Sequence, residues 1–251
     1  MATYLYCLTD AGSVPAADLC GLGEAPVRAL PVAGRAAAWV SDLPVGLGPV
    51  TEELARAHDR VVRAALSRET PLPARFGQSF AGEKALLREL EARVEGIVQA
   101  LERVRGGVEM TVRVLLPYVG SDLVSPVGIA GLAPGAVALP ESRPRSSTPV
   151  GAGRAYLARL RERQEAAADL RRQAEFLQAR VARAVDGVAR EEVCSEVMPG
   201  SQSFSLSHLV ARDAVGPYRL AVDSLVEGDP GLRALVSGPW APYSFARIAD
   251  G

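Results

Sequence analysis

The sequence is short of the residues on which several kinds of site depend. Its 251 residues include a single lysine, two histidines, three cysteines and no asparagine. An odd number of distant cysteines without a CxxC spacing indicates neither a disulfide framework nor a zinc site. We therefore expect no bound metal, and we expect buried thiols at Cys7, Cys20 and Cys194.

Net charge and long apolar runs are also lacking. The formal charge is −1, and no stretch carries arginines without acidic residues among them, which argues against a nucleic-acid partner. No apolar run approaches the roughly 20 residues of a membrane span, and the first residues, MATYLYCLTDAG, lack the basic and apolar regions of a signal peptide. These features predict a cytoplasmic protein that does not enter a membrane.

The motifs of phosphate, dinucleotide and nucleophile sites are missing as well. Neither G-x-x-x-x-G-K-[ST] nor G-x-G-x-x-G nor G-x-S-x-G occurs. The two histidines, His58 and His208, have no carboxylate cluster beside them in the sequence, so an ordinary packing or surface role is expected for both. The sequence therefore predicts a protein that is not an enzyme and that holds no cofactor.

What is present is a C-terminal stretch, Leu232–Arg247, that combines prolines with aromatic residues. Its first residues alternate as in a short strand, which we expect to end at Val236. Two prolines then stiffen the chain without a hydrogen-bonded ladder. This segment carries Trp240, Tyr243 and Phe245, and each ring can bury about 150–250 Å². The tail either closes the core of its own chain as a clasp or is held ready for a partner.

A second stiff segment, Pro71–Phe80, carries the most conspicuous charge of the first half. Its two prolines enforce an extended path, and Phe76 is an apolar anchor. Arg75, next to Phe76, is open to two interpretations. It forms an internal ion pair that joins strand to helix, or it binds a carboxylate or a carbonyl group of a partner.

Periodicity predicts an α+β protein. In the first half we expect a strand at Thr3–Thr9, a hairpin of Val27–Ala33 with Arg35–Ser41, a helix at Thr51–Arg68 capped near Thr51, and one helix at Glu83–Arg105. In the second half we expect strands at Val108–Leu116, Glu192–Met198, Ser203–Ala211 and Leu232–Val236, and helices at Ala155–Glu192 and Asp213–Val226.

The second-half order, βαββαβ, is that of a modified ferredoxin-like domain with a long helix. We therefore predict two domains, 1–106 and 107–251, with a Pro- and Gly-rich insertion at about 117–153 and a closing tail at 238–251. The long helix carries an apolar seam that runs from Leu157 to Val188. The seam fits packing on its own sheet and also fits weak self-association.

Six segments, taken together, resemble the GvpF/GvpL gas vesicle proteins nearly end to end. They are an opening Y-L-Y strand, P-x-P-x-R-F-G from Pro71, V-E-M-x-V-R-V from Val108, G-R-A-Y-L from Gly153, a strand ending in H-L-V-A-R, and the closing G-P-W-x-P-Y-S-F from Gly238. The closing motif is the most specific of them.

The resemblance implies a non-enzymatic accessory protein that assists assembly of the gas vesicle shell. As partners it implies the hydrophobic shell protein GvpA and other accessory proteins, and it leaves open whether the protein stays as a minor shell component. It also implies two α+β domains, the second ferredoxin-like. Trp240, Tyr243 and Phe245 are then candidate partner contacts, with Arg75 and Phe76 as a second patch.

Two alternatives of other classes stay open. Ferredoxin-like domains often bind small molecules or dimerise at their edges, so a ligand-sensing regulatory protein is one alternative, on fold analogy alone. An enzyme with an unrecognised site is the other. Binding of a metabolite would favour the first, and a neighbouring gene for a short hydrophobic shell protein would favour the gas vesicle role.

Overall fold

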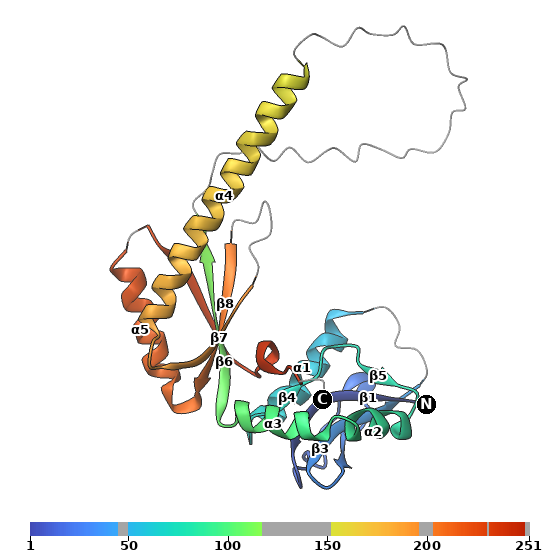
Figure 1. Cartoon of the computed structure of the whole chain (residues 1–251). Helices are drawn as coiled ribbons and strands as arrows, with labels where there is room; N and C mark the ends of the chain where they lie inside the picture. Colours follow the sequence, from blue (N-terminus) through green and yellow to red (C-terminus); the bar gives the residue numbers. More distant parts are fainter. Residues whose placement is uncertain (45–49, 117–151, 196–202, 230, 249–251) are drawn as a thin grey trace, which may run out of the picture.

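The computed structural model describes residues 1–44, 50–116, 152–195, 203–229 and 231–248. The insertion expected at 117–153 lies outside these residues, apart from its last two positions, which belong to a helix. The described chain forms two antiparallel sheets, each with its own helices (Figure 1). The predicted α+β class is confirmed.

The first sheet has the strand order β2-β3-β1-β4, and β5 also pairs with β1. Its strands are β1 (Ala2–Asp10), β2 (Arg28–Val32), β3 (Ala36–Leu43), β4 (Leu72–Pro73) and β5 (Ser79–Phe80). The predicted hairpin is confirmed, since β2 and β3 pair in antiparallel fashion from Arg28↔Val40 to Val32↔Ala36.

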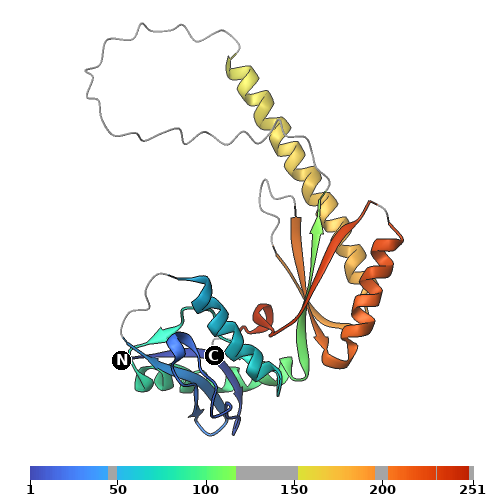
Figure 2. The ribbon, with the colours of Figure 1, turned by 180° about the vertical axis from the view of Figure 1, so that it is seen from behind.

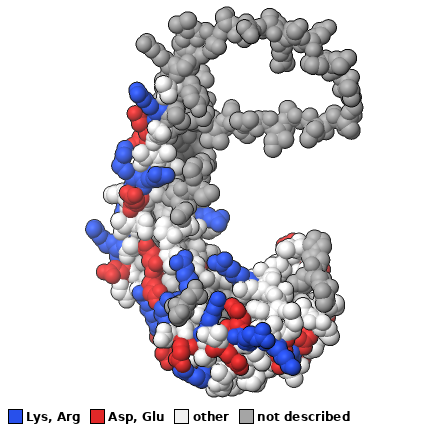
Figure 3. Space-filling view, turned by 45° about the vertical axis from the view of Figure 1, so that its right-hand side comes forward, with Lys and Arg blue, Asp and Glu red and all other residues white. Residues whose placement is uncertain are grey.

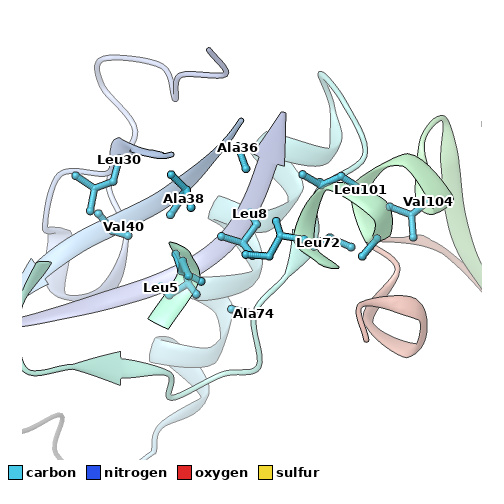
Figure 4. Packing of buried hydrophobic residues seen from close by; sticks show 14 of the residues in the cluster. Leu5, Leu8, Leu30, Ala36, Ala38, Val40, Leu72, Ala74, Leu101 and Val104 are labelled. Carbon is cyan, nitrogen blue, oxygen red and sulfur yellow. The ribbon is translucent and has the colours of Figure 1, made fainter. Parts of the chain in front are cut away.

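Helices cover both faces of this sheet. Helix α1 (Glu52–Leu66) packs with Tyr4 and Tyr6 of β1 on one face, together with η1 (Leu22–Glu24). On the other face, Leu5 and Leu8 of β1 pack against α2 (Glu83–Glu91) and α3 (Val94–Val104) (Figure 4). Because the central strand is buried on both faces, it reads as a continuous apolar run.

The single helix predicted at Glu83–Arg105 is wrong, since the chain breaks between α2 and α3. Arg93 leaves the helical region, with φ −118° and ψ 16°, and the Arg93 N–H bonds back three residues to the carbonyl of Leu90. Apolar residues of both helices, among them Leu86 and Ile97, nevertheless share one core cluster. The break thus leaves both helices packed on the same face of the sheet.

The second sheet has the order β7-β8-β6-β9, with all neighbours antiparallel. Its strands are β6 (Gly107–Leu115), β7 (Ala189–Cys194), β8 (Ser203–Ala211) and β9 (Arg233–Trp240). Helices α4 (Ala152–Ala184) and α5 (Val215–Glu227), the latter preceded by η3 (Arg212–Ala214), pack on one face. This is the predicted βαββαβ arrangement, with both helices on one side (Figure 2).

Helix α4 ends at Ala184, so its predicted end at Glu192 is wrong. Gly187, at φ +75°, lies in the turn that follows, and residues from Ala189 onward pair with β8 instead. The second half of the apolar seam packs on the sheet, through residues such as Ala174 and Val181. Leu157, near the start of α4, is 54 % exposed on the part of the helix that extends away from the sheet (Figure 1).

The two sheets meet at the start of β6. All strands of the first sheet precede Gly106 and all strands of the second follow it, yet Val108 and Leu209 of the second sheet belong to the core clusters of the first. The Thr70 hydroxyl also donates to the Gly107 carbonyl at 2.8 Å. The division into two domains stays a prediction, because the halves share buried apolar contacts.

Both histidines are buried and hydrogen bonded on both ring nitrogens. His58 Nδ1 lies 2.9 Å from the Tyr4 hydroxyl, and His58 Nε2 lies 3.2 Å from the Ala74 carbonyl. His208 Nδ1 lies 2.8 Å from the Tyr218 hydroxyl, and Nε2 lies 3.0 Å from a Glu192 oxygen. The packing role is confirmed, but His208 does have a carboxylate beside it, which strand pairing supplies.

Only one of the cysteines matches the expectation of buried thiols. Cys7 is fully buried in β1, Cys20 is intermediate, and Cys194 is exposed at the end of β7. Burial raises the pKa of the Cys7 thiol, and so does the charge of Glu69. Cys194 is exposed because β7 is an edge strand, a property that its sequence neighbours do not reveal.

Stability is expected to fall as the pH drops from about 7.5 to 5.5. Burial lowers the pKa of His58 and, against an opposing effect of Glu192, that of His208. Below the unfolded pKa of about 6.5, the unfolded chain takes up protons that the folded chain resists, so the free energy of unfolding decreases. Urea denaturation across this range measures the decrease. In His58→Gln the free energy of unfolding should decrease less over the same pH range. An unchanged decrease would exclude His58 as its source.

Candidate interaction surface at the junction of the two sheets

After β9 the C-terminal tail crosses from the second sheet to the first. Ala241 joins the cluster on the α1 side of the first sheet, and Phe245 joins the cluster on the α2–α3 side. Phe245, in the short helix η4 (Tyr243–Phe245), is only 2 % exposed. One tail therefore contacts the cores of both faces of the first sheet, as expected of a clasp.

Two charged side chains hold the tail in place. Glu109 of β6 is 6 % exposed, and its two carboxylate oxygens accept hydrogen bonds from the Ser244 N–H at 2.8 Å and the Ser244 hydroxyl at 2.7 Å. Arg103 of α3 donates to the Phe245 carbonyl. A buried carboxylate is stable only when it is hydrogen bonded, so Glu109 and Ser244 depend on one another.

The strand that was expected to end at Val236 is longer in the structure, so this prediction of its end is wrong. Strand β9 continues to Trp240, which pairs with Glu109 across an irregularity in the register. Gly238 makes this possible, since it adopts φ +115° and a Cβ there would lie 2.7 Å from the Glu109 carbonyl oxygen. Hydrogen bonding to β6, as well as proline, therefore orders the start of the tail.

A groove of about 370 Å³ lies where the tail meets the first sheet. Its apolar residues come from β1, from the β4–β5 segment, from α2 and α3, and from the tail: Leu5, Leu8, Leu72, Phe80, Leu90, Ile97 and Ile248. Val193 of β7 adds an apolar residue from the second sheet, and Gln78, Glu89 and Ser244 are among the polar residues of the lining. The groove thus depends on both sheets and on the tail between them.

Arginines surround the groove. Arg75 and Arg247 are exposed, and neither side chain forms an ion pair with any residue that the structure describes. Arg93, also in the lining, pairs with Glu89 at 3.1 Å. The internal ion pair considered for Arg75 is not found among the described residues, so this guanidinium is available in the groove lining.

The five sequence-predicted contact residues separate into three groups. Arg75 and Tyr243 both line the groove, and Tyr243 is 40 % exposed. Phe76 and Phe245 are core residues, and the Phe76 ring stacks edge-on against His58 at 5.8 Å. Trp240, 36 % exposed, lies outside the groove, with the Arg63 guanidinium 4.7 Å from its ring centroid.

Sequence patterns did not point to Arg247 or Ile248 as lining residues, because they lie beyond the closing motif. The tail placed them here by crossing between the sheets. A signal for Glu109 did exist, since it is an acid in a strand of otherwise apolar and uncharged residues up to Val112.

The described residues hold no group of three or more metal-binding side chains. No helix in the described part is long and apolar enough to cross a membrane. On the face shown in Figure 3, positive and negative side chains are interspersed. The surface and fold therefore define an α+β protein with a ferredoxin-like second half and, where its sheets meet, a groove lined by both apolar and charged residues.

Comparison with known proteins gives the family. The model of the family described as "Gas vesicle synthesis protein GvpL/GvpF" matches residues 2–247. A relative from Streptomyces sp. (strain CB03234), "Gas vesicle protein L", is 31 % identical over 247 residues, which is 95 % of this chain and 79 % of the relative. The chain belongs to the GvpL/GvpF family of gas vesicle proteins.

Solved structures give the same fold. The crystal structure of GvpF from Anabaena sp. PCC7120 matches with a TM-score of 0.71 at 16 % identity, over 99 % of this chain and 97 % of that one. The structure of GvpF from Microcystis aeruginosa matches with a TM-score of 0.70 at 16 % identity, over 98 % and 99 %. Family membership supports a role in gas vesicle formation.

Substitution in the tail is expected to separate its structural residue from its exposed one. Phe245→Ala should lower the free energy of unfolding by about 3–5 kcal/mol, because it leaves a cavity in a buried cluster. Tyr243→Ala should cost less, because that side chain is partly exposed. Urea denaturation of both variants measures the difference, with the exposed Leu220→Ala as control. Equal losses in all three would contradict the clasp.

Proposed function

We propose that this protein assists assembly of the gas vesicle shell by binding the hydrophobic shell protein GvpA and other accessory proteins, with the junction groove as the surface for GvpA. The observation that carries the proposal is one groove in which apolar side chains, the partly exposed Tyr243 and Arg75, which forms no ion pair with a described residue, meet. Family membership supplies the biological setting.

The chemistry of the groove suits an apolar partner. A shell that keeps water out of a gas space needs subunits with a large apolar face, and before assembly such a face tends to aggregate. The helix residues of the lining, Leu90 and Ile97, are buried, so the apolar side chains that a partner can reach include those of the partly exposed Phe80 and Ile248. Transient cover of that kind protects the shell protein without a permanent bond.

The polar groups of the lining determine which groups of a partner can bind beside its apolar residues. Partial burial raises the pKa of Tyr243, with a further contribution from Asp59. The neutral Tyr243 hydroxyl can donate a hydrogen bond. Arg75 and Arg247 can each bind a carboxylate or a backbone carbonyl group. We infer that the bound segment of GvpA presents an acceptor group next to its apolar residues.

The lining is also well anchored. The tail is fixed by the hydrogen bonds between Ser244 and Glu109 and by burial of Phe245 in the core. The extended segment that precedes β5 is fixed by a hydrogen bond from the Ala74 N–H to the Tyr6 carbonyl, at 2.8 Å. A groove on fixed elements loses little conformational entropy when it binds. This supports direct docking over folding on binding.

The proposal is tested by affinity purification of the tagged protein co-expressed with GvpA. Arg75→Glu and Tyr243→Ala should each reduce GvpA recovery about tenfold, equivalent to about 1.4 kcal/mol of binding free energy. Arg183→Glu, an exposed position on α4, is the matched control and should retain GvpA. Circular dichroism shows whether each variant remains folded.

Full GvpA recovery by both folded groove variants would exclude the groove as the binding surface. Trp240→Ala belongs in the same set, because Trp240 lies outside the groove against Arg63. If Trp240→Ala no longer recovers GvpA while both groove variants still do, the binding surface lies at α1 instead. A thermal shift with a small metabolite, abolished by Arg75→Glu, would favour the alternative of a ligand-sensing protein.

A further inference from the structure

The outer edge of the second sheet is unoccupied among the described residues. Strand β9 is the last in the order β7-β8-β6-β9, so it has a neighbouring strand on one side only. This edge is opposite to β7, whose Val193 lines the junction groove. An unpaired strand edge is a template for another chain, and natural proteins usually protect it.

On the face away from α4 and α5, leucine and arginine side chains of β6 and the first part of β9 alternate in a checkerboard of four residues, Arg113, Leu115, Arg233 and Leu235. Leu235 pairs directly with Arg113, and Arg233 pairs directly with Leu115. These positions alternate with residues such as Val112, which is buried under the helices. Two leucines and two arginines therefore share one small exposed area.

All four side chains are open to solvent. Leu235 is 66 % exposed and Leu115 is 48 % exposed. Arg113 and Arg233 are also exposed, and neither forms an ion pair within the described part of the chain. Exposed leucines next to uncompensated cations on a sheet edge suit an apolar partner that carries negative charge.

A hollow of about 360 Å³ lies at the same edge, and residues from both faces of the sheet line it. The checkerboard residues contribute from one face. Val226, Leu232 and Ala234 contribute from the face that α5 covers. Because side chains of a strand point alternately to opposite faces, an added strand would place every second residue toward these apolar groups and the others beside Leu235 and Arg233.

We propose that β9 accepts a strand from another protein at this edge, namely an extended segment in which apolar residues alternate with aspartate or glutamate. Pairing would cover Arg233–Ser237. Beyond it Pro239 has no N–H group, and Arg219 of α5 already donates to the Gly238 carbonyl at 2.6 Å. The acidic side chains of the partner pair with the arginines of the checkerboard.

Charge decides between this partner and a second copy of the chain. Two copies paired through β9 would bring Arg113 and Arg233 of both onto one face, where β6 and β9 provide no acid from Thr111 to Leu115 or from Arg233 to Ser237. Like charges across strands are destabilising. A partner with acidic residues removes that repulsion and still covers the leucines.

The test uses a fluorescein-labelled peptide, Val-Glu-Val-Leu-Val-Glu-Val, and the same peptide with lysine in place of glutamate. Fluorescence polarisation with the full-length protein should show binding of the glutamate peptide at least about tenfold tighter than that of the lysine peptide. Leu235→Lys should abolish binding. Leu220→Lys, at a leucine on α5 that is 68 % exposed, is the matched control and should not change it.

Two further measurements identify the mode of binding. Arg233→Glu should reverse the preference in favour of the lysine peptide. Hydrogen exchange should slow at those amides of Arg233–Ser237 that face away from β6 when the glutamate peptide is bound, because an added strand bonds to the N–H groups on the free edge.

Several outcomes would overturn the proposal. They are the absence of binding at the solubility limit of the glutamate peptide, equal binding by Leu235→Lys and the native protein, and binding without protection of the β9 amides. A dimer of the native protein that Leu235→Lys dissociates would instead assign the edge to a second copy. The surface is separate from the groove, so retention of GvpA does not affect this result.

Discussion

The hydrogen bonds between Glu109 and Ser244 are the constraint on which the rest of the structure depends. They fix the tail near the start of β6, where the two sheets meet, and so they bring Phe245 into the core of the first sheet. A buried carboxylate without these donors would destabilise the junction. The tail in turn forms one side of the groove, so the same two bonds support both folding and the proposed docking surface.

The two surfaces differ in ways that suit different partners. The groove combines an apolar floor with Tyr243 and Arg75 and is formed by elements that are fixed on several sides. The β9 edge has no neighbouring strand among the described residues, and Leu235 is exposed on it. The groove lies beside the first sheet and β9 lies at the edge of the second sheet away from β7, so the two proposed surfaces share no lining residue.

Sequence reasoning succeeded where a local signal controls the structure. The cap at Thr51 is confirmed, since its hydroxyl accepts a bond from the Leu54 N–H, and the βαββαβ order followed from periodicity. It failed where contacts between residues far apart in the sequence determine where an element ends. Strand pairing ended α4 before Ala189 and carried β9 on to Trp240. The groove could not be predicted because only the crossing tail brings its residues together.

Native-state hydrogen exchange tests most directly whether the tail makes the two sheets one cooperative unit. The slowest amides of β1 and β3 in the first sheet, and of β6 and β8 in the second, should exchange with the same opening free energy. Phe245→Ala should lower that free energy equally in both sheets. If the second sheet keeps its protection while the first loses it, the sheets are independent domains and the account of the clasp is wrong.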